Sequence, residues 1–128
     1  MRRLLAGCLL LALAACAEQL PTSGTRFPVF FETWSAAIDP AATRSIQAAA
    51  DLAKQNPTAR VVVVGYADPT GSAQANLDIS RARAQMVADA LVQNGVPAER
   101  IRRAGKGEAP VIGDLQESRR VDIIIAPQ

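Results

Sequence analysis

The sequence predicts a small α/β protein of the α+β sandwich type, in which a sheet packs against two main helices. The chain has 128 residues, of which 49% are hydrophobic and 20% charged, and this composition suits one globular domain. Short apolar stretches predict four strands, and longer segments with apolar residues at helical spacing predict two helices. Their order, strand–helix–strand–helix–strand–strand, implies a small sheet covered by both helices.

The first half of the predicted domain supplies a strand, a helix and a second strand. Residues 28–31 (PVFF) predict the first strand. Residues 39–55 predict a helix, because an Asp-Pro pair provides an N-cap and a favoured first helical residue. The run of four valines at 61–64 predicts a central strand that is covered on both faces.

The second half supplies a longer helix and two more strands. This helix is expected from about Ser72 or Asn76 to Asn94, and the glycine that follows predicts a left-handed stop in a Schellman-like ending. Residues 101–104 predict the third strand. Residues 119–126 predict the fourth, because their apolar side chains alternate along the chain.

The start of the chain resembles a secretory signal. Arg2 and Arg3 form a positive region, and residues 4–15 form an apolar stretch of the length expected for such a signal. A membrane-spanning helix needs roughly 20 apolar residues. We therefore expect a cleaved signal, with an uncleaved anchor as the alternative.

The segment Leu13-Ala14-Ala15-Cys16 resembles the lipobox of bacterial lipoproteins. This resemblance implies that Cys16 receives a diacylglycerol and becomes the first residue after cleavage. The expected organisation is a lipoprotein signal peptide at 1–15, a lipidated cysteine with a short linker at 16–26, and a folded domain at 27–128.

The other reading of the two cysteines is a disulfide between Cys8 and Cys16. In one apolar helix their Cα atoms would lie about 12 Å apart, beyond the reach of a disulfide. The residue after Cys16 is Ala17 and not Asp. By the sorting rule of enteric lipoproteins, this implies the periplasmic face of the outer membrane.

The charge of the chain excludes several classes of function. Two of the 14 basic residues lie in the leader, which leaves 12 basic and 12 acidic residues in the remainder. A nucleic-acid partner is not expected, since it would require a basic excess. The sequence contains no histidine, the commonest general base and metal ligand. No cofactor or metal is therefore expected.

Two charged residues are candidates for a binding site. Asp68 begins an Asp-Pro-Thr-Gly segment that is, by itself, typical of a type I turn. Arg83 shares helical spacing with Ile79, Val87 and Leu91, so it falls on or beside the apolar stripe, although its long side chain could instead snorkel past the edge of the core. An anionic and a cationic group could therefore face one opening near the start of the helix.

These residues belong to blocks that resemble a known family. Residues 65–71 (GYADPTG) and 76–87 (NLDISRARAQMV) resemble the signature of OmpA-like domains, G-H-T-D-x-x-G followed by N-x-x-L-S-x-x-R-A-x-x-V. Residues 105–108 (GKGE) and 118–122 (SRRVD) resemble the later blocks G-x-G-E and N-R-R-V-E. The resemblance covers about residues 27–128 and implies a small mixed four-stranded sheet packed against two main helices.

The resemblance also implies non-covalent binding of peptidoglycan, in the lipid-anchored architecture of peptidoglycan-associated lipoproteins. The family's aspartate meets the amino group of the stem peptide's diaminopimelate, and its arginine holds the carboxylate. These roles fall on Asp68 and Arg83. Asn76, Gly71 and Leu77 belong to the same implied site, although Asn76 could equally be an internal helix or turn cap.

The chain departs from the family pattern in three places. Tyr66-Ala67 replaces the family's His-Thr, and Ser118 replaces an asparagine. The segment between Pro110 and Arg119 is shorter than usual and lacks a Gly-Arg element. These departures affect the rim of the expected pocket and leave its two charged residues in place.

Two other functions are alternatives. An envelope scaffold could bind a Tol-like or secretion-system protein, with the neighbourhood of Trp34 as the contact patch. A wall hydrolase would need a metal or an activated nucleophile. Paired carboxylates would be its remaining route, and no two acidic residues stand out. The sequence therefore favours a binding protein over an enzyme.

Overall fold

A computed structural model of the chain describes residues 20–21, 23–109 and 114–127. The leader, with Cys8 and Cys16, lies outside these residues, so its cleavage and lipidation stay predictions. The described elements are, in order, β1 (Thr25–Phe30), α1 (Pro40–Gln55), β2 (Arg60–Ala67), α2 (Ala73–Gln93), the 3-10 turn η1 (Ala98–Arg100), β3 (Ile101–Glu108), α3 (Leu115–Ser118) and β4 (Arg120–Ala126).

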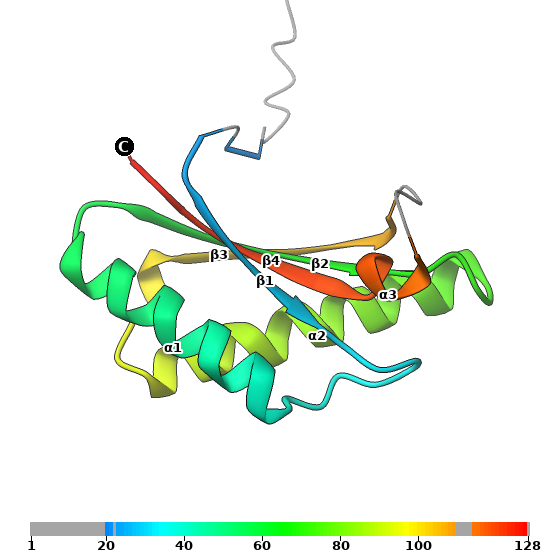
Figure 1. Cartoon of the computed structure of the whole chain (residues 1–128). Coiled ribbons are helices and arrows are strands. Elements are labelled where there is room, and N and C mark those ends of the chain that lie inside the picture. The colour runs from blue at the N-terminus through cyan, green and yellow to red at the C-terminus, as the bar shows by residue number, and fades with distance from the viewer. Residues whose placement is uncertain (1–19, 22, 110–113, 128) are drawn as a thin grey trace, which may run out of the picture.

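The four strands form one mixed sheet in the order β1-β4-β2-β3. β4 runs antiparallel to both β1 and β2, whereas β2 and β3 are parallel. Figure 1 shows α1 and α2 on the same side of this sheet. The predicted α+β sandwich, with a small mixed four-stranded sheet against two main helices, is confirmed.

The main core lies between the sheet and the two long helices. α1 contributes alanines, whose small side chains let a helix lie close to a sheet. α2 contributes larger residues, and the strands contribute the side chains that point toward the helices. The best-buried members of this core are Ile46, Ala49, Ala50, Ala53, Val61, Val63, Val87, Leu91, Val121 and Ile123.

The opposite side of the sheet, which we call the outer face, carries a second and smaller apolar cluster. It consists of Val62, Val64, Ile124 and Ala126, with Leu20 and Tyr66 packed against it. The prediction that the valine strand is covered on both faces holds in part. The helices cover one face of the strand. On the other face, the side chains of Leu20 and Tyr66 pack against the smaller cluster.

The helix starts follow the local sequence. Asp39 accepts a hydrogen bond from the Ala42 N–H at 2.7 Å, and Pro40 takes the first helical position, as predicted. Of the two predicted starts for α2, the earlier one is right, because the Ser72 hydroxyl accepts from the Ala75 N–H at 3.1 Å.

The predicted end of α2 is also confirmed. Gly95 adopts a φ of +95°, in the left-handed region. Its N–H donates to the Val92 carbonyl at 3.0 Å, and the Val96 N–H donates to the Leu91 carbonyl at 3.1 Å. These two bonds are the Schellman pattern.

β1 and β3 are longer than predicted, and two short helices are additional. β1 begins at Thr25 and not at residue 28, because its first residues pair with the end of β4. β3 continues to Glu108, since its parallel pairing with β2 extends through a polar, glycine-containing stretch that has no apolar pattern. The short helices η1 and α3 were not predicted.

No helix in the described residues is long and apolar enough to cross a membrane.

Candidate functional site

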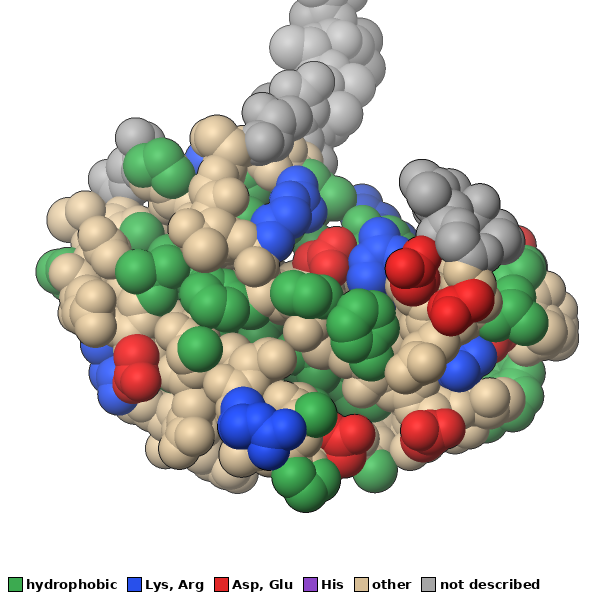
Figure 2. Space-filling view, viewed as in Figure 1, with side chains coloured by type: hydrophobic (Ala, Val, Ile, Leu, Met, Phe, Trp, Pro, Cys, Tyr) green, Lys and Arg blue, Asp and Glu red, His purple; other side chains and the backbone are tan. Residues whose placement is uncertain are grey.

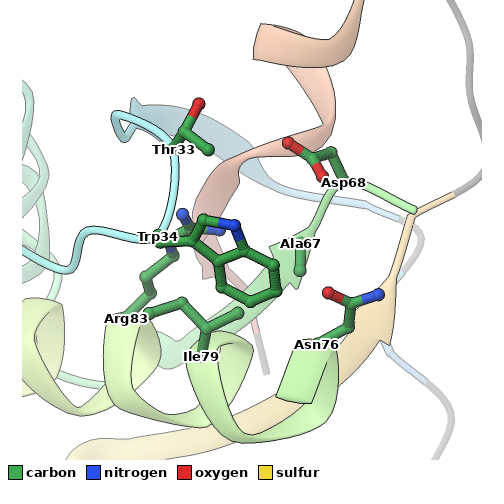
Figure 3. A pocket seen from close by; sticks show the side chains of 7 residues that line it. All are labelled: Thr33, Trp34, Ala67, Asp68, Asn76, Ile79 and Arg83. Carbon is green, nitrogen blue, oxygen red and sulfur yellow. The ribbon is translucent and has the colours of Figure 1, made fainter. Parts of the chain in front are cut away.

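The candidate site lies at the carboxyl ends of the two parallel strands. Asp68 directly follows β2, Glu108 ends β3, and Asn76 lies in the first turns of α2. Because the carboxyl ends of parallel strands meet at one edge of a sheet, these residues come together. Arg83, two turns further along α2, reaches the same place from below the sheet (Figure 3). The topology thus unites residues up to 40 positions apart.

Asp68 is a buried carboxylate with three donors around it. One of its oxygens accepts from the Thr70 N–H at 3.0 Å and from the Thr70 hydroxyl. The other accepts from Arg119 Nη1 at 3.2 Å. Burial alone would raise the pKa of Asp68, but the hydrogen bonds from Thr70 and Arg119 and the charge of Arg119 lower it below its ordinary value. Asp68 is therefore ionised at neutral pH.

Arg83 is the largest fully buried side chain of the described residues, with 1% of its surface exposed. Its guanidinium donates to three backbone carbonyls: Nε to Ser35 at 2.8 Å, Nη2 to Glu32 at 3.0 Å and Nη1 to Tyr66 at 3.1 Å. Its charged end is inside the protein, so the alternative of an arginine that snorkels past the core edge is wrong.

The pKa of Arg83 is lowered to about 10, chiefly by burial, with the charge of Asp68 raising it and the charge of Arg119 lowering it. Arg83 therefore still carries its charge at neutral pH. A guanidinium has five N–H donors. Three are engaged with the carbonyls, which leaves two for another acceptor.

Both charged residues line one small pocket. Its lining residues are Thr33, Trp34, Ala67, Asp68, Asn76, Ile79 and Arg83. Figure 3 shows the indole ring of Trp34 in the centre of this group. The remaining cavity has a volume of about 10 Å³, room for about one water molecule. The pocket as it stands is nearly filled by Trp34.

Trp34 has two unusual features. Half of its side chain is exposed, and its φ of +52° lies in the left-handed region that few bulky residues adopt. The edge of its ring lies against Gly71, where an added Cβ would come within 2.7 Å of Trp34 Cη2. Trp34 therefore covers the pocket, and the separate contact patch suggested for it coincides with the pocket's rim.

The other predicted site residues are placed as follows. Asn76 is buried and donates to Glu108 Oε1 at 3.0 Å, so it ties α2 to the end of β3 and is not a cap. Gly71 lies beneath Trp34. Leu77 lies beside Gly107 of β3 and is not among the residues that line the pocket. Cys16 lies outside the described residues.

Two residues at the site were not among the predicted site residues. Arg119 pairs with Asp68 and also donates to the Phe31 carbonyl at 3.0 Å. Its Arg-Arg block belongs to the family resemblance, but nothing in the chain's spacing indicates that the first arginine reaches Asp68. For Trp34, the sequence predicts only a contact patch for another protein. The single tryptophan of the chain, next to an expected strand end, was the available signal.

Tyr66, which takes the place of a family histidine, does not contribute its side chain to the pocket. Its ring packs on the outer face of the sheet, where the guanidinium of Arg120 lies 4.6 Å from its centroid. Only its backbone carbonyl takes part, as an acceptor for Arg83. This departure from the family pattern therefore changes the outer face more than the pocket.

The arrangement suits the binding of a small group that carries two opposite charges. An ionised carboxylate and a buried cation with two remaining donors can together receive a group that carries both charges. Among the described residues, no group of three or more His, Cys, Asp or Glu side chains is placed to hold a metal ion.

The fold and the site define a class of protein: small α+β sandwich domains with a buried arginine and an ionised aspartate at the carboxyl end of a parallel strand pair. A model of the OmpA family matches residues 30–120. The chain therefore belongs to the OmpA family.

Two relatives share more than a third of their aligned residues with this chain. The probable lipoprotein YiaD of Escherichia coli (strain K12) is 37% identical over 105 residues, which cover 77% of this chain and 48% of YiaD. The peptidoglycan-binding protein ArfA of Mycobacterium bovis is 36% identical over 104 residues, which cover 77% of this chain and 32% of ArfA. The chain thus matches about half of the one relative and a third of the other.

Solved structures agree with the fold. The peptidoglycan-associated lipoprotein from Burkholderia pseudomallei matches with a TM-score of 0.70 at 23% identity, over 76% of this chain and 87% of that one. The OmpA-like domain of FopA1 from Francisella tularensis matches with a TM-score of 0.72 at 24% identity, over 80% and 71%. At these identities the likeness concerns the fold.

Proposed function

We propose that this protein is a lipid-anchored binding module that holds peptidoglycan without cutting it and so ties the outer membrane to the cell wall. The observation that carries the proposal is the pairing of Asp68 and Arg83 in one pocket. The ligand is the diaminopimelate of the stem peptide, whose side-chain end carries an ammonium and a carboxylate.

The two charges of this ligand match the two residues. Asp68 is ionised, and each carboxylate oxygen has more than one lone pair, so it can accept from an ammonium while Thr70 and Arg119 stay in place. Arg83 has two N–H donors left for the ligand carboxylate. Asn76 lines the pocket, and Gly71 lies against the Trp34 ring that covers it. Leu77 packs beside Gly107 of β3, outside the pocket lining.

The relatives support the same reading. One of them is named a peptidoglycan-binding protein and another a probable lipoprotein. Neither name describes a reaction. The lipid anchor at Cys16, the linker to Arg26 and the outer-membrane location belong to this proposal, as does any Tol-like protein partner.

The N-terminal end of the domain and the proposed binding pocket lie at opposite ends of the sheet, as a link between membrane and wall requires. Thr25, where the chain enters the sheet, pairs with Ile125, and Arg60 pairs with Ala126 beside it. Asp68 lies at the other end of β2, which is eight residues long, and so about 23 Å away. The end that would connect to the membrane and the end that would hold the wall therefore point in opposite directions.

The test is binding to purified sacculi. Residues 17–128 contain every described element and both apolar clusters, so this segment has a complete core and can be used without leader and lipid. We expect it to sediment with sacculi, and Asp68→Asn to weaken binding at least tenfold. Asp89→Asn, an exposed carboxylate further along α2, is the matched control.

Arg83 is tested with Arg83→Lys, because a residue that engages three carbonyls also supports the fold. Binding is compared only for variants with an unchanged far-ultraviolet circular dichroism spectrum. Sacculus binding by Asp68→Asn equal to that of Asp89→Asn would refute the proposed site. Release of soluble fragments from the sacculi would refute the claim that the wall is not cut.

A further inference from the structure

The outer face of the sheet contains a second, larger hollow that the proposed function does not use. It is a groove of about 520 Å³ along the start of β2 and most of β3. Four cationic residues line it: Arg60, Arg102, Arg103 and Lys106. Its apolar lining includes Val62 and Ala104. Figure 2, which shows one face of the molecule, has Lys and Arg side chains on the upper side, next to acidic ones, and also over the long helices.

The register of the strands explains why these charges collect there. Val62 pairs with Arg102 across the parallel strands, and Val62 belongs to the outer cluster, so Arg102 points to the outer face as well. Arg60 and Lys106 follow the same alternation, two residues before Val62 and four after Arg102. Three exposed cations therefore share this face.

These cations differ from the other basic residues of the outer face. Arg120 lies 3.3 Å from Asp122 and stacks on Tyr66, and Arg26 lies 3.8 Å from the same carboxylate. Among the described residues, no ion pair engages Arg60, Arg102, Arg103 or Lys106. Because the chain after the leader has equal numbers of acidic and basic residues, this patch is a local excess and not a reflection of the net charge.

The N-terminal segment runs to the same groove. Leu20 packs against the outer cluster, and Leu20 and Pro21 form part of the groove's lining. Cys16, the proposed lipid attachment site, is four residues earlier, at most about 14 Å from Leu20 along an extended chain. If the lipid is attached there, only these four residues separate the anchor from the sheet, because Leu20 and Pro21 already lie against it.

From this placement we infer that the groove on the outer face meets the membrane surface, where Arg60, Arg102 and Lys106 contact the phosphates of anionic phospholipids. The inference rests on the lipid anchor of the proposed function for its orientation. Cationic side chains near an anionic lipid surface strengthen binding, and salt screens this attraction. Anionic lipid is the favoured occupant because the groove lies beside the chain's route to the anchor, and its β2 residues, Arg60 and Val62, lie at the end of that strand opposite Asp68.

The experiment measures binding of residues 17–128 to sedimented vesicles, without the lipid anchor. We expect binding to vesicles of phosphatidylcholine with 40% phosphatidylglycerol, on the order of tenfold tighter than to phosphatidylcholine alone, and weaker as salt rises. The double variant Arg60→Gln/Arg102→Gln should lose at least fivefold, and adding Lys106→Gln should lose more. Arg44→Gln/Lys54→Gln removes two exposed charges from α1 and should stay within twofold of the unsubstituted chain.

Two further arms separate this inference from the proposed function. Asp68→Asn should bind anionic vesicles normally, and Arg60→Gln/Arg102→Gln should bind sacculi normally. Equal binding to both vesicle types, or equal losses in the two double variants, overturns the inference. Loss of sacculus binding in Arg60→Gln/Arg102→Gln also overturns it, because the face would then hold an acidic wall polymer. Failure of sacculus binding by the unsubstituted chain would refute the wall-binding proposal alone.

Discussion

Arg119 Nη1 lies 3.2 Å from Asp68 Oδ2, and both side chains are largely buried. The pair joins the start of β4 to the end of β2, so the carboxylate is fixed in place before any ligand arrives. Arg119 is held in turn by the Phe31 carbonyl at the end of β1. Three of the four strands therefore position one carboxylate, which indicates a preorganised acceptor.

This pair should be energetically coupled. In a double-mutant cycle with Asp68→Asn and Arg119→Gln, we expect a coupling free energy of about 1–2 kcal/mol, because hydrogen bonds to charged groups in partly buried positions are stronger than those at the surface. The measurement is urea unfolding of the four proteins. The exposed pair Asp51–Lys54, 3.5 Å apart on α1, is the control and should show a coupling near zero. Equal couplings for the two pairs would contradict the assigned role of Arg119.

Arg83 should contribute more to stability than either member of that pair. Arg83→Met leaves the carbonyls of Glu32, Ser35 and Tyr66 without their donor, and we expect a loss of about 3–5 kcal/mol in the free energy of unfolding. Arg83→Lys keeps the charge but not the planar fork, so it should lose less. Chemical denaturation measures both, and a loss below about 1 kcal/mol for Arg83→Met would show that the carbonyls find other donors.

The sequence predicted the elements whose residues carry local signals. The Asp-Pro start of α1, the serine cap of α2 and its glycine stop each depend on neighbouring residues, and each appears as expected. β3 was predicted too short because its second half takes its conformation from pairing with β2 and not from its own polar residues. In this half of β3, pairing with β2 outweighs the weak strand preference of its own residues.

The same division applies to the site. Local patterns made Asp68 and Arg83 candidates, and the resemblance to OmpA-like domains assigned both to one site; both line the pocket. That Arg83 would be held by three carbonyls could not be predicted, since two of those carbonyls lie about 50 residues away in the loop after β1. Arg119 was missed as a partner of Asp68 for the same reason.

Gly71→Ala should displace the Trp34 ring, which covers the pocket. Its φ of +88° is strained for alanine, and the added Cβ would come within 2.7 Å of the Trp34 ring. We expect a loss of about 1–3 kcal/mol and a shift in the emission of Trp34, the only tryptophan. Gly95→Ala is the control, because its φ of +95° gives a similar strain but the nearest atom is the flexible side chain of Lys54 at 3.3 Å. A similar emission change in both variants would argue against the contact.

Ligand entry should also be visible through Trp34. A cavity of about 10 Å³ cannot receive an ammonium and a carboxylate, so the indole must move when the proposed ligand binds. Titration with a soluble diaminopimelate-containing stem peptide should change the Trp34 emission with saturation. A lysine-containing stem peptide has the ammonium without the second carboxylate and should bind at least tenfold more weakly. Binding detected by calorimetry without any emission change would place the ligand elsewhere.

The stability contribution of Asp68 should depend on pH in a defined direction. Its pKa is lower in the folded protein than in the unfolded chain, so the ionised form stabilises the fold above the ordinary aspartate value of about 4. That contribution is lost as the pH falls through the folded pKa. The unfolding free energies of the unsubstituted chain and Asp68→Asn should therefore differ by about 1–2 kcal/mol at pH 7, and the difference should shrink only below pH 4. Urea titrations between pH 7 and pH 2.5 measure it, and a difference that already shrinks between pH 7 and pH 5 would mean that burial outweighs the donors and raises the pKa of Asp68.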